Sequence, residues 1–301
     1  MKLLVAGLPD NVDMIDLGVG TLTEWRRHGV SHAELRRGLQ LGTFTQLRRS
    51  WYAINGADPA AVEAVSKGGA IGCLSALGYH RVWMPPQPHR LHLRGNGHAH
   101  RIHPGRYCTQ FGGRPQPVRS VLDEPLTALR HALRCLDPEG ITVVCDSLLN
   151  TSRRALAGEP VTEILTAAEV ASAFEGAPAR IVACLHRCDA RAASGTETMV
   201  RLRLRSRNVK VIVQAHVPGL GHVDLLVGER LLIEVDSKQH HTGIDSYRED
   251  RRRDQVAARL GLLRMRLTYE NVVYEWPQTE IGILSTVRNG HHRAPRRFRQ
   301  A

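Results

Sequence analysis

Three carboxylates lie within a short stretch that reads as a β-hairpin. Asp224 belongs to an apolar run that ends at a Gly-Glu-Arg turn, and Glu234 and Asp236 belong to the run that follows. Because side chains alternate along a strand, we expect Glu234, Asp236 and Lys238 on one face. A hairpin would place Asp224 beside them. An ordinary amphipathic strand with solvated acids is the alternative interpretation.

Three carboxylates that share a site repel one another, and a hard divalent cation removes that conflict. We therefore expect Asp224, Glu234 and Asp236 to hold Mg2+ or Mn2+, which would activate a water for phosphodiester hydrolysis. Lys238 would steady that water or neutralise phosphate charge. His240 would protonate the leaving oxygen or orient a water, or else bond to a neighbouring helix. If the protein does not catalyse hydrolysis, we expect no cofactor.

These residues also carry a resemblance to known nucleases. V-D-L followed by I-E-V-D-S-K-Q-H-H resembles the PD-(D/E)xK superfamily, and most closely the very-short-patch-repair-like endonuclease domains with their I-E-x-D-G-x-x-H signature. E-D-R-R-R-D-Q-V-A-A-R-L-G and the run ending in R-L-T are similar to that family's next helix and strand. S-G-T-E-T-M-V resembles its opening helix, which implies that Glu197 joins the metal site. Ser194 and Glu197 are equally a capping box. Ser237 stands where the family usually has glycine.

The N-terminal part reads as a helix-turn-helix followed by a β-rich wing. Ser31 and Glu34 form a capping box that opens a helix with Leu35 and Leu39 facing inward, and residues 43–54 then alternate as strands do. A small helical domain with a solvated basic face is the alternative. The residues expected to contact DNA are His32, Arg36 and Arg37 in the helix, Arg48 and Arg49 in the wing, and Arg251 and Arg252 farther along.

The stretch V-S-H-A-E-L-R-R-G-L-Q-L-G-T-F-T-Q-L-R-R-S-W-Y-A-I resembles the N-terminal winged helix of the AbiEi-type antitoxin and regulator family. Ser50 stands where the family's wing has glycine. Proteins of this family often carry a middle region before a very-short-patch-repair-like domain, so the resemblance covers most of the chain.

Composition indicates a globular protein with a polyanionic partner. The 301 residues are 42% hydrophobic, and the formal charge of +12 comes mostly from arginine. Double-stranded DNA is the expected partner, and an anionic membrane surface is a weaker alternative. The sequence has no apolar run long enough to span a membrane, and its N-terminus is a poor signal peptide, so we expect no membrane segment and a cytoplasmic location.

The expected fold class is α+β with several domains. We expect a winged helix-turn-helix at 1–58, a mixed α/β middle region at 59–190, a restriction-endonuclease-like α/β domain at 191–287 and a basic tail at 288–301. The middle region has no catalytic signature. Within it, residues 141–147 read as a buried strand or a helix start, and Asp146 reads as a cap.

Cysteines and histidines give a weaker signal. Of six scattered cysteines, only the pair Cys184 and Cys188 has a metal-like spacing, and a second pair is missing, so buried reduced thiols are expected. The histidines of residues 89–103 alternate with arginines around Gly-Asn-Gly. This predicts a polar hairpin that contacts phosphates rather than a metal.

Two functions from different classes follow. The first is a DNA endonuclease that a winged helix directs to its target. The second is a non-cleaving, sequence-specific repressor of the phage-immunity or antitoxin type, which keeps an inactive nuclease fold as a second DNA-binding surface. An antitoxin with a cognate toxin rests on family analogy alone, and a homodimer is compatible with each of the three.

Overall fold

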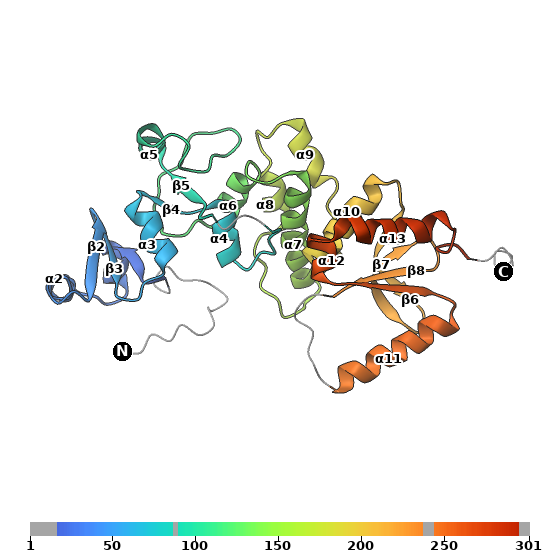
Figure 1. Cartoon of the computed structure of the whole chain (residues 1–301). Helices are drawn as coiled ribbons and strands as arrows, with labels where there is room; N and C mark the ends of the chain where they lie inside the picture. Colours follow the sequence, from blue (N-terminus) through green and yellow to red (C-terminus); the bar gives the residue numbers. More distant parts are fainter. Residues whose placement is uncertain (1–16, 87–89, 237–243, 295–301) are drawn as a thin grey trace.

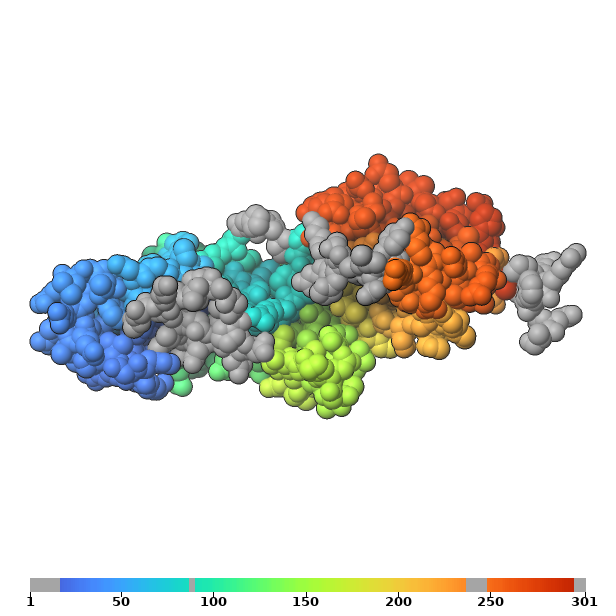
Figure 2. All heavy atoms as spheres, turned by 90° about the horizontal axis from the view of Figure 1, so that it is seen from below, coloured from blue at the N-terminus to red at the C-terminus, as the bar shows by residue number. Residues whose placement is uncertain are grey.

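The computed structural model describes residues 17–86, 90–236 and 244–294, with the side chains of 244–247 excepted. Within these ranges it has 13 helices and three small sheets, which confirms a mixed α+β protein. Three regions follow one another along an elongated molecule (Figures 1 and 2). Lys238, His240 and the end of the basic tail lie outside the described residues. Of the described helices, none is long and apolar enough to cross a membrane.

The N-terminal region consists of two helices and a three-stranded antiparallel sheet in the order β1-β3-β2. Reciprocal capping boxes open both helices, as the sequence predicts for the second at Ser31 and Glu34. The elements are β1 (Val19–Thr21), α1 (Leu22–Arg27), α2 (His32–Gln40), β2 (Phe44–Arg48) and β3 (Trp51–Ile54).

Helix α2 packs through a glycine as well as a leucine. Leu35 is buried as expected, but Leu39 is 36% exposed, so its predicted inward orientation is wrong. Gly38 faces the sheet instead, where an added Cβ would lie 2.6 Å from the ring of Phe44. A flat spot on the helix therefore lets the hairpin approach closely.

The middle region is mainly helical, with a two-stranded antiparallel sheet of β4 and β5. One apolar cluster runs from Trp51 of the N-terminal sheet through Val65 to Leu148, so these two regions share a core. The elements are α3 (Pro59–Ser66), β4 (Gly69–Ile71), α4 (Cys73–Tyr79), β5 (Leu93–Gly95), α5 (Gly97–Ile102), α6 (Pro125–Ala132), α7 (Pro138–Leu156), α8 (Ala167–Ser172) and α9 (Ala179–Leu185).

Two local predictions in this region are corrected. Residues 141–147 are helical rather than a strand, and their helix starts earlier than predicted. Helix α7 begins at Pro138, and Asp137 caps it by accepting a hydrogen bond from the Gly140 backbone N–H. The Gly-Asn-Gly sequence is not a hairpin turn. Asn96 instead caps α5 by accepting a hydrogen bond from the Ala99 backbone, so the histidine run passes from a strand into a helix.

The C-terminal region is a four-stranded mixed sheet between two helical layers. Strands β6, β7 and β8 are antiparallel neighbours, and α11 crosses over to β9, which pairs parallel with β8. Helices α10, α12 and α13 cover one face and α11 the other (Figure 1). The elements are α10 (Gly195–Ser206), β6 (Val211–Val217), β7 (Gly221–Val227), β8 (Leu231–Val235), α11 (Ile244–Arg259), β9 (Leu263–Leu267), α12 (Tyr269–Val273) and α13 (Trp276–Arg288).

A buried ion pair joins the middle and C-terminal regions. Asp146 lies in mid-helix on α7 rather than in a cap, and its Oδ2 accepts from Arg201 Nη2 at 2.6 Å and from the Thr198 hydroxyl at 2.7 Å. Its Oδ1 accepts from the Asp189 backbone. Each oxygen of the buried carboxylate thus has donors, which offset its loss of hydration and fix α10 against α7.

Candidate functional site

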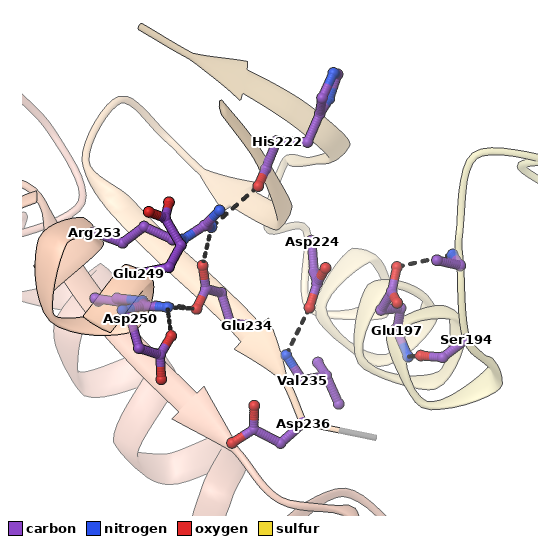
Figure 3. A pocket seen from close by; sticks show the side chains of 12 residues that line it. Ser194, Glu197, His222, Asp224, Glu234, Val235, Asp236, Glu249, Asp250 and Arg253 are labelled. Atoms are coloured by element: carbon purple, nitrogen blue, oxygen red, sulfur yellow. Dashed lines mark hydrogen bonds and ion pairs between the residues drawn. The ribbon is translucent and has the colours of Figure 1, made fainter. Parts of the chain in front are cut away.

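A pocket of about 460 Å³ opens where α10, β7, β8 and α11 meet (Figure 3). Its lining includes six carboxylates but only two guanidinium groups, although the chain as a whole carries a formal charge of +12. These charged residues are Glu197, Asp224, Glu234, Asp236, Glu249 and Asp250, with Arg253 and Arg264.

A backbone kink shapes the sheet at this pocket. The pairing of β6 with β7 passes from Val213↔Leu225 to Ala215↔Val223, and Gln214 between them has a φ of 49°. Val213 and Leu225 pack on the α10 side, whereas Ala215 and Val223 pack on the α11 side. Residues two apart in a regular strand would share a face. The kink therefore reverses the faces that the strand residues occupy on its two sides, and Asp224, which lies between Val223 and Leu225, lines the pocket.

Glu197 and Asp224 come together at the kink. The Gln214 side-chain amide donates to Glu197 Oε2 at 3.0 Å and to Asp224 Oδ1 at 3.3 Å. The Ala193 backbone also donates to Glu197 Oε2, and the Val235 backbone donates to Asp224 Oδ2 (Figure 3). Burial and the nearby Asp224 raise the pKa of Glu197 to about 7. Burial likewise raises the pKa of Asp224. Among the residues that the structure describes, neither carboxylate forms an ion pair with a lysine or arginine that would compensate its charge.

Glu234 has a different environment from the one expected. Its Oε1 accepts from Arg253 Nη2 at 2.6 Å and its Oε2 from Arg264, which also binds Asp254 of α11. Figure 3 shows Glu234 directed toward Arg253, whereas Asp224 is directed toward the Val235 backbone. The sequence predicted that Asp224, Glu234 and Asp236 gather on one face. Within the described residues, no three carboxylates of the pocket bring an oxygen each within 4.8 Å of one another.

Asp236 lies at the end of β8 and lines the pocket beside the other acids. Its backbone N–H donates to the Leu267 carbonyl at 2.8 Å, which extends the β8–β9 pairing by one position. The chain leaves the described residues immediately after Asp236, so the roles predicted for Lys238 and His240 stay predictions.

Most of the residues predicted to contact DNA are exposed. His32, Arg36 and Arg37 lie on the solvent side of α2, and Arg49 lies at the turn of the hairpin. Arg48 differs because its guanidinium stacks 5.0 Å from the Trp51 ring centroid, where burial lowers its pKa. It therefore supports the hairpin from inside.

The two arginines predicted on α11 are also exposed. Arg252 is engaged with Glu249 at 2.6 Å and with the Gly219 carbonyl, and Arg251 lies 3.8 Å from Asp254. Both can reach a phosphate only in competition with acids of their own helix.

Sequence reasoning missed Gln214 and Arg264. Gln214 is a polar residue in a mainly apolar strand, ten positions before Asp224, and this was the available signal. Arg264 stands on β9 opposite Leu232, a register that only the parallel pairing of β8 with β9 reveals. In comparisons with known proteins, no family model, curated protein or solved structure matches this chain.

Proposed function

We propose that this chain is a DNA-binding protein whose C-terminal domain hydrolyses DNA phosphodiesters with the help of a divalent cation. The observation that carries the proposal is the Glu197–Asp224 pair, a buried and a half-buried carboxylate that converge at an open pocket in a strongly basic protein. The order α10-β6-β7-β8-α11-β9 supports it, because the restriction-endonuclease-like domains that the sequence resembles have this helix, hairpin and crossover.

The donor set of this pair fits a hard cation. Carboxylate oxygens are what Mg2+ prefers, and one or two of them suffice when water and phosphate oxygens complete the shell. Glu197 and Asp224 would hold the ion, with Asp236 at the rim. When bound, the ion supplies a more acidic water and stabilises charge on the phosphate. Without a cation, the acidic pocket would repel a DNA backbone.

We assign Glu234 a positioning role in place of the metal ligation that the sequence suggested. Its carboxylate holds the guanidiniums of Arg253 and Arg264, which come from α11 and β9. The two guanidinium groups are thereby held next to the pocket, where they can contact a phosphate. Lys238 and His240 keep their predicted roles at the attacking water and the leaving oxygen.

The N-terminal region is the proposed targeting module. Two capped helices followed by a β-hairpin have the order of a winged helix, in which the second helix enters the major groove. Arg36 and Arg37 are exposed on that helix, and Arg49 extends from the hairpin turn. Arginine at these places would supply bidentate contacts to bases and phosphates.

A plasmid assay tests cleavage. Supercoiled DNA is incubated with the full chain and Mg2+ or Mn2+, beside the variants Glu197→Gln and Asp224→Asn. We expect nicking or linearisation that falls by about 10²-fold or more in both variants, as for loss of one group that stabilises the reacting charges. Glu249→Gln is the matched control, because Glu249 lines the same pocket but is exposed and paired with Arg252. It should stay within about three-fold of the wild type.

A second candidate function is non-cleaving DNA binding by an inactive nuclease fold. The pairing of Glu234 with two arginines favours it, as does the absence of three converging carboxylates among the described residues. If no DNA is cut and a mobility-shift assay in EDTA gives equal sequence-specific binding for the wild type and Asp224→Asn, this second function replaces the first.

A further inference from the structure

Four soft donors meet in the middle region, far along the chain from one another. Cys73, His92, Cys108 and Cys135 each place a ligand atom within 4.8 Å of the other three. No other group of three or more histidines, cysteines or acids does so among the residues that the structure describes. We propose that these four residues bind a structural Zn2+ ion.

The distances agree with a tetrahedral ion. Zinc lies about 2.3 Å from sulfur and about 2.0–2.1 Å from nitrogen, so tetrahedral edges are about 3.8 Å between sulfurs and about 3.6 Å between sulfur and nitrogen. The Cys135 and Cys108 sulfurs are 3.7 Å apart, and His92 Nδ1 is 3.3 Å from the Cys108 sulfur. Four protein donors leave no open position, which is the mark of a structural rather than a catalytic site.

The backbone is organised to deliver these side chains. Cys73 and His92 lie just beyond the paired ends of β4 and β5, where the Gly72 N–H donates to the His92 carbonyl at 2.9 Å. The Cys108 N–H donates to the Leu93 carbonyl at 2.8 Å, which places its loop against β5. Three of the four ligands are therefore positioned by one small sheet, and Cys135 arrives from the end of α6.

Cys73 also has an unfavourable backbone conformation. Its φ is 53°, in the left-handed region that a side chain with a Cβ enters at a cost, and its side chain is fully buried. Such conformations persist where the surroundings over-determine them, often at ligand clamps. Here the strained position directs the thiol at the other three donors.

A metal ion would anchor a long irregular segment of this region. Residues 103–124 contain no helix or strand, a long connection for a compact domain, and Cys108 lies within it. An ion shared by Cys108, β4–β5 and α6 fixes this connection to the core. One imidazole and three thiolates favour zinc over harder cations.

The test begins with the metal content of the full chain, purified under reducing conditions without added metal. Native mass spectrometry and elemental analysis should find one zinc per chain. Replacing the ion with Co2+ should give the intense thiolate charge-transfer absorption of a tetrahedral site. Cys108→Ser and His92→Ala should lose the metal, whereas His92→Cys should retain it because four donors remain.

Cys188→Ser is the matched control, since Cys188 is a half-buried cysteine outside the cluster, and it should keep full occupancy. If a cluster variant fails to fold, the metal content and cobalt spectrum of the wild type still decide the matter. Wild-type protein that contains no metal and binds neither Zn2+ nor Co2+ would overturn the proposal. So would a Cys108–Cys135 disulfide in a separate preparation isolated without reductant, located by mass spectrometry of its peptides.

Discussion

The carboxylate pocket and the cysteine–histidine cluster are both places where polar side chains converge, yet the chain builds them in opposite ways. Asp224, Glu234 and Asp236 come from one hairpin. The cluster takes its donors from four separate segments, and Cys108 is 16 positions from His92 and 27 from Cys135. The pocket could therefore be proposed from the sequence, whereas the cluster could not.

The two places also differ in how their donors are satisfied. In the pocket, Glu234 already has two arginines, and Gln214 bridges Glu197 and Asp224. In the cluster, the Cys108 sulfur lies against the Cys135 sulfur and the His92 imidazole. Closeness in the sequence is thus enough to propose candidate residues. Whether such a residue holds a metal or positions another side chain depends on the contacts around it.

The largest stability effect in the pocket should come from Glu197. Its pKa is raised from 4.5 to about 7, so between these values the folded state binds more protons than the unfolded state. Stability is then fully present below the unfolded pKa and falls as the pH rises through the folded pKa, by up to about 3 kcal/mol. In EDTA, Glu197→Gln should be more stable than the wild type by about this amount at pH 8.

Urea denaturation of both proteins from pH 4.5 to pH 8 measures this difference, and the titration of groups remote from Glu197 cancels in it. The gap should widen up to about pH 7, level off above it, and narrow when Mg2+ is added. Parallel stability curves would show that Glu197 has no raised pKa and would remove the electrostatic basis for the cation site.

Sequence reasoning predicted the mixed fold, the second capped helix, the hairpin after it and the strands of the pocket, because each depends on neighbours in the chain. It failed where a partner comes from elsewhere. Residues 141–147 are apolar enough for a strand, but the cap at Asp137 makes them part of a helix. A regular hairpin was expected to place Asp224 beside Glu234, and the kink at Gln214 breaks the regularity on which that argument depends.

Glu234→Gln should lower the stability of the folded protein, whereas Glu197→Gln should raise it. Its carboxylate is mostly buried between Arg253 and Arg264, and its neutralisation leaves two guanidiniums short of a partner. We expect a loss of about 1–3 kcal/mol at neutral pH, since Arg264 keeps its contact with Asp254. Chemical denaturation measures it, with the exposed Glu249→Gln as the control at less than about 1 kcal/mol. If Glu234→Gln proved more stable than the wild type, repulsion from the other carboxylates would outweigh the contacts of Glu234 with the two arginines.

The smallest effect concerns two residues with a backbone that suits glycine. Ser50 has a φ of 64° at the hairpin turn, and Cys73, the first residue of α4, has a φ of 53°. Ser50→Gly removes the steric cost of the left-handed region, and the greater freedom of glycine in the unfolded chain offsets part of that gain. Thermal and urea denaturation should show a gain of about 0.5–1 kcal/mol.

Cys73→Gly relieves the same kind of strain but removes a thiol from the cluster. If the cluster binds zinc, this variant should lose the ion and be less stable than the wild type, although its backbone is relaxed. If this variant instead gained stability, as Ser50→Gly should, zinc binding would not be what offsets the strain at Cys73. Because removal of the buried Cys73 side chain also costs stability by itself, loss of zinc together with loss of stability separates a strained metal ligand from a strained turn.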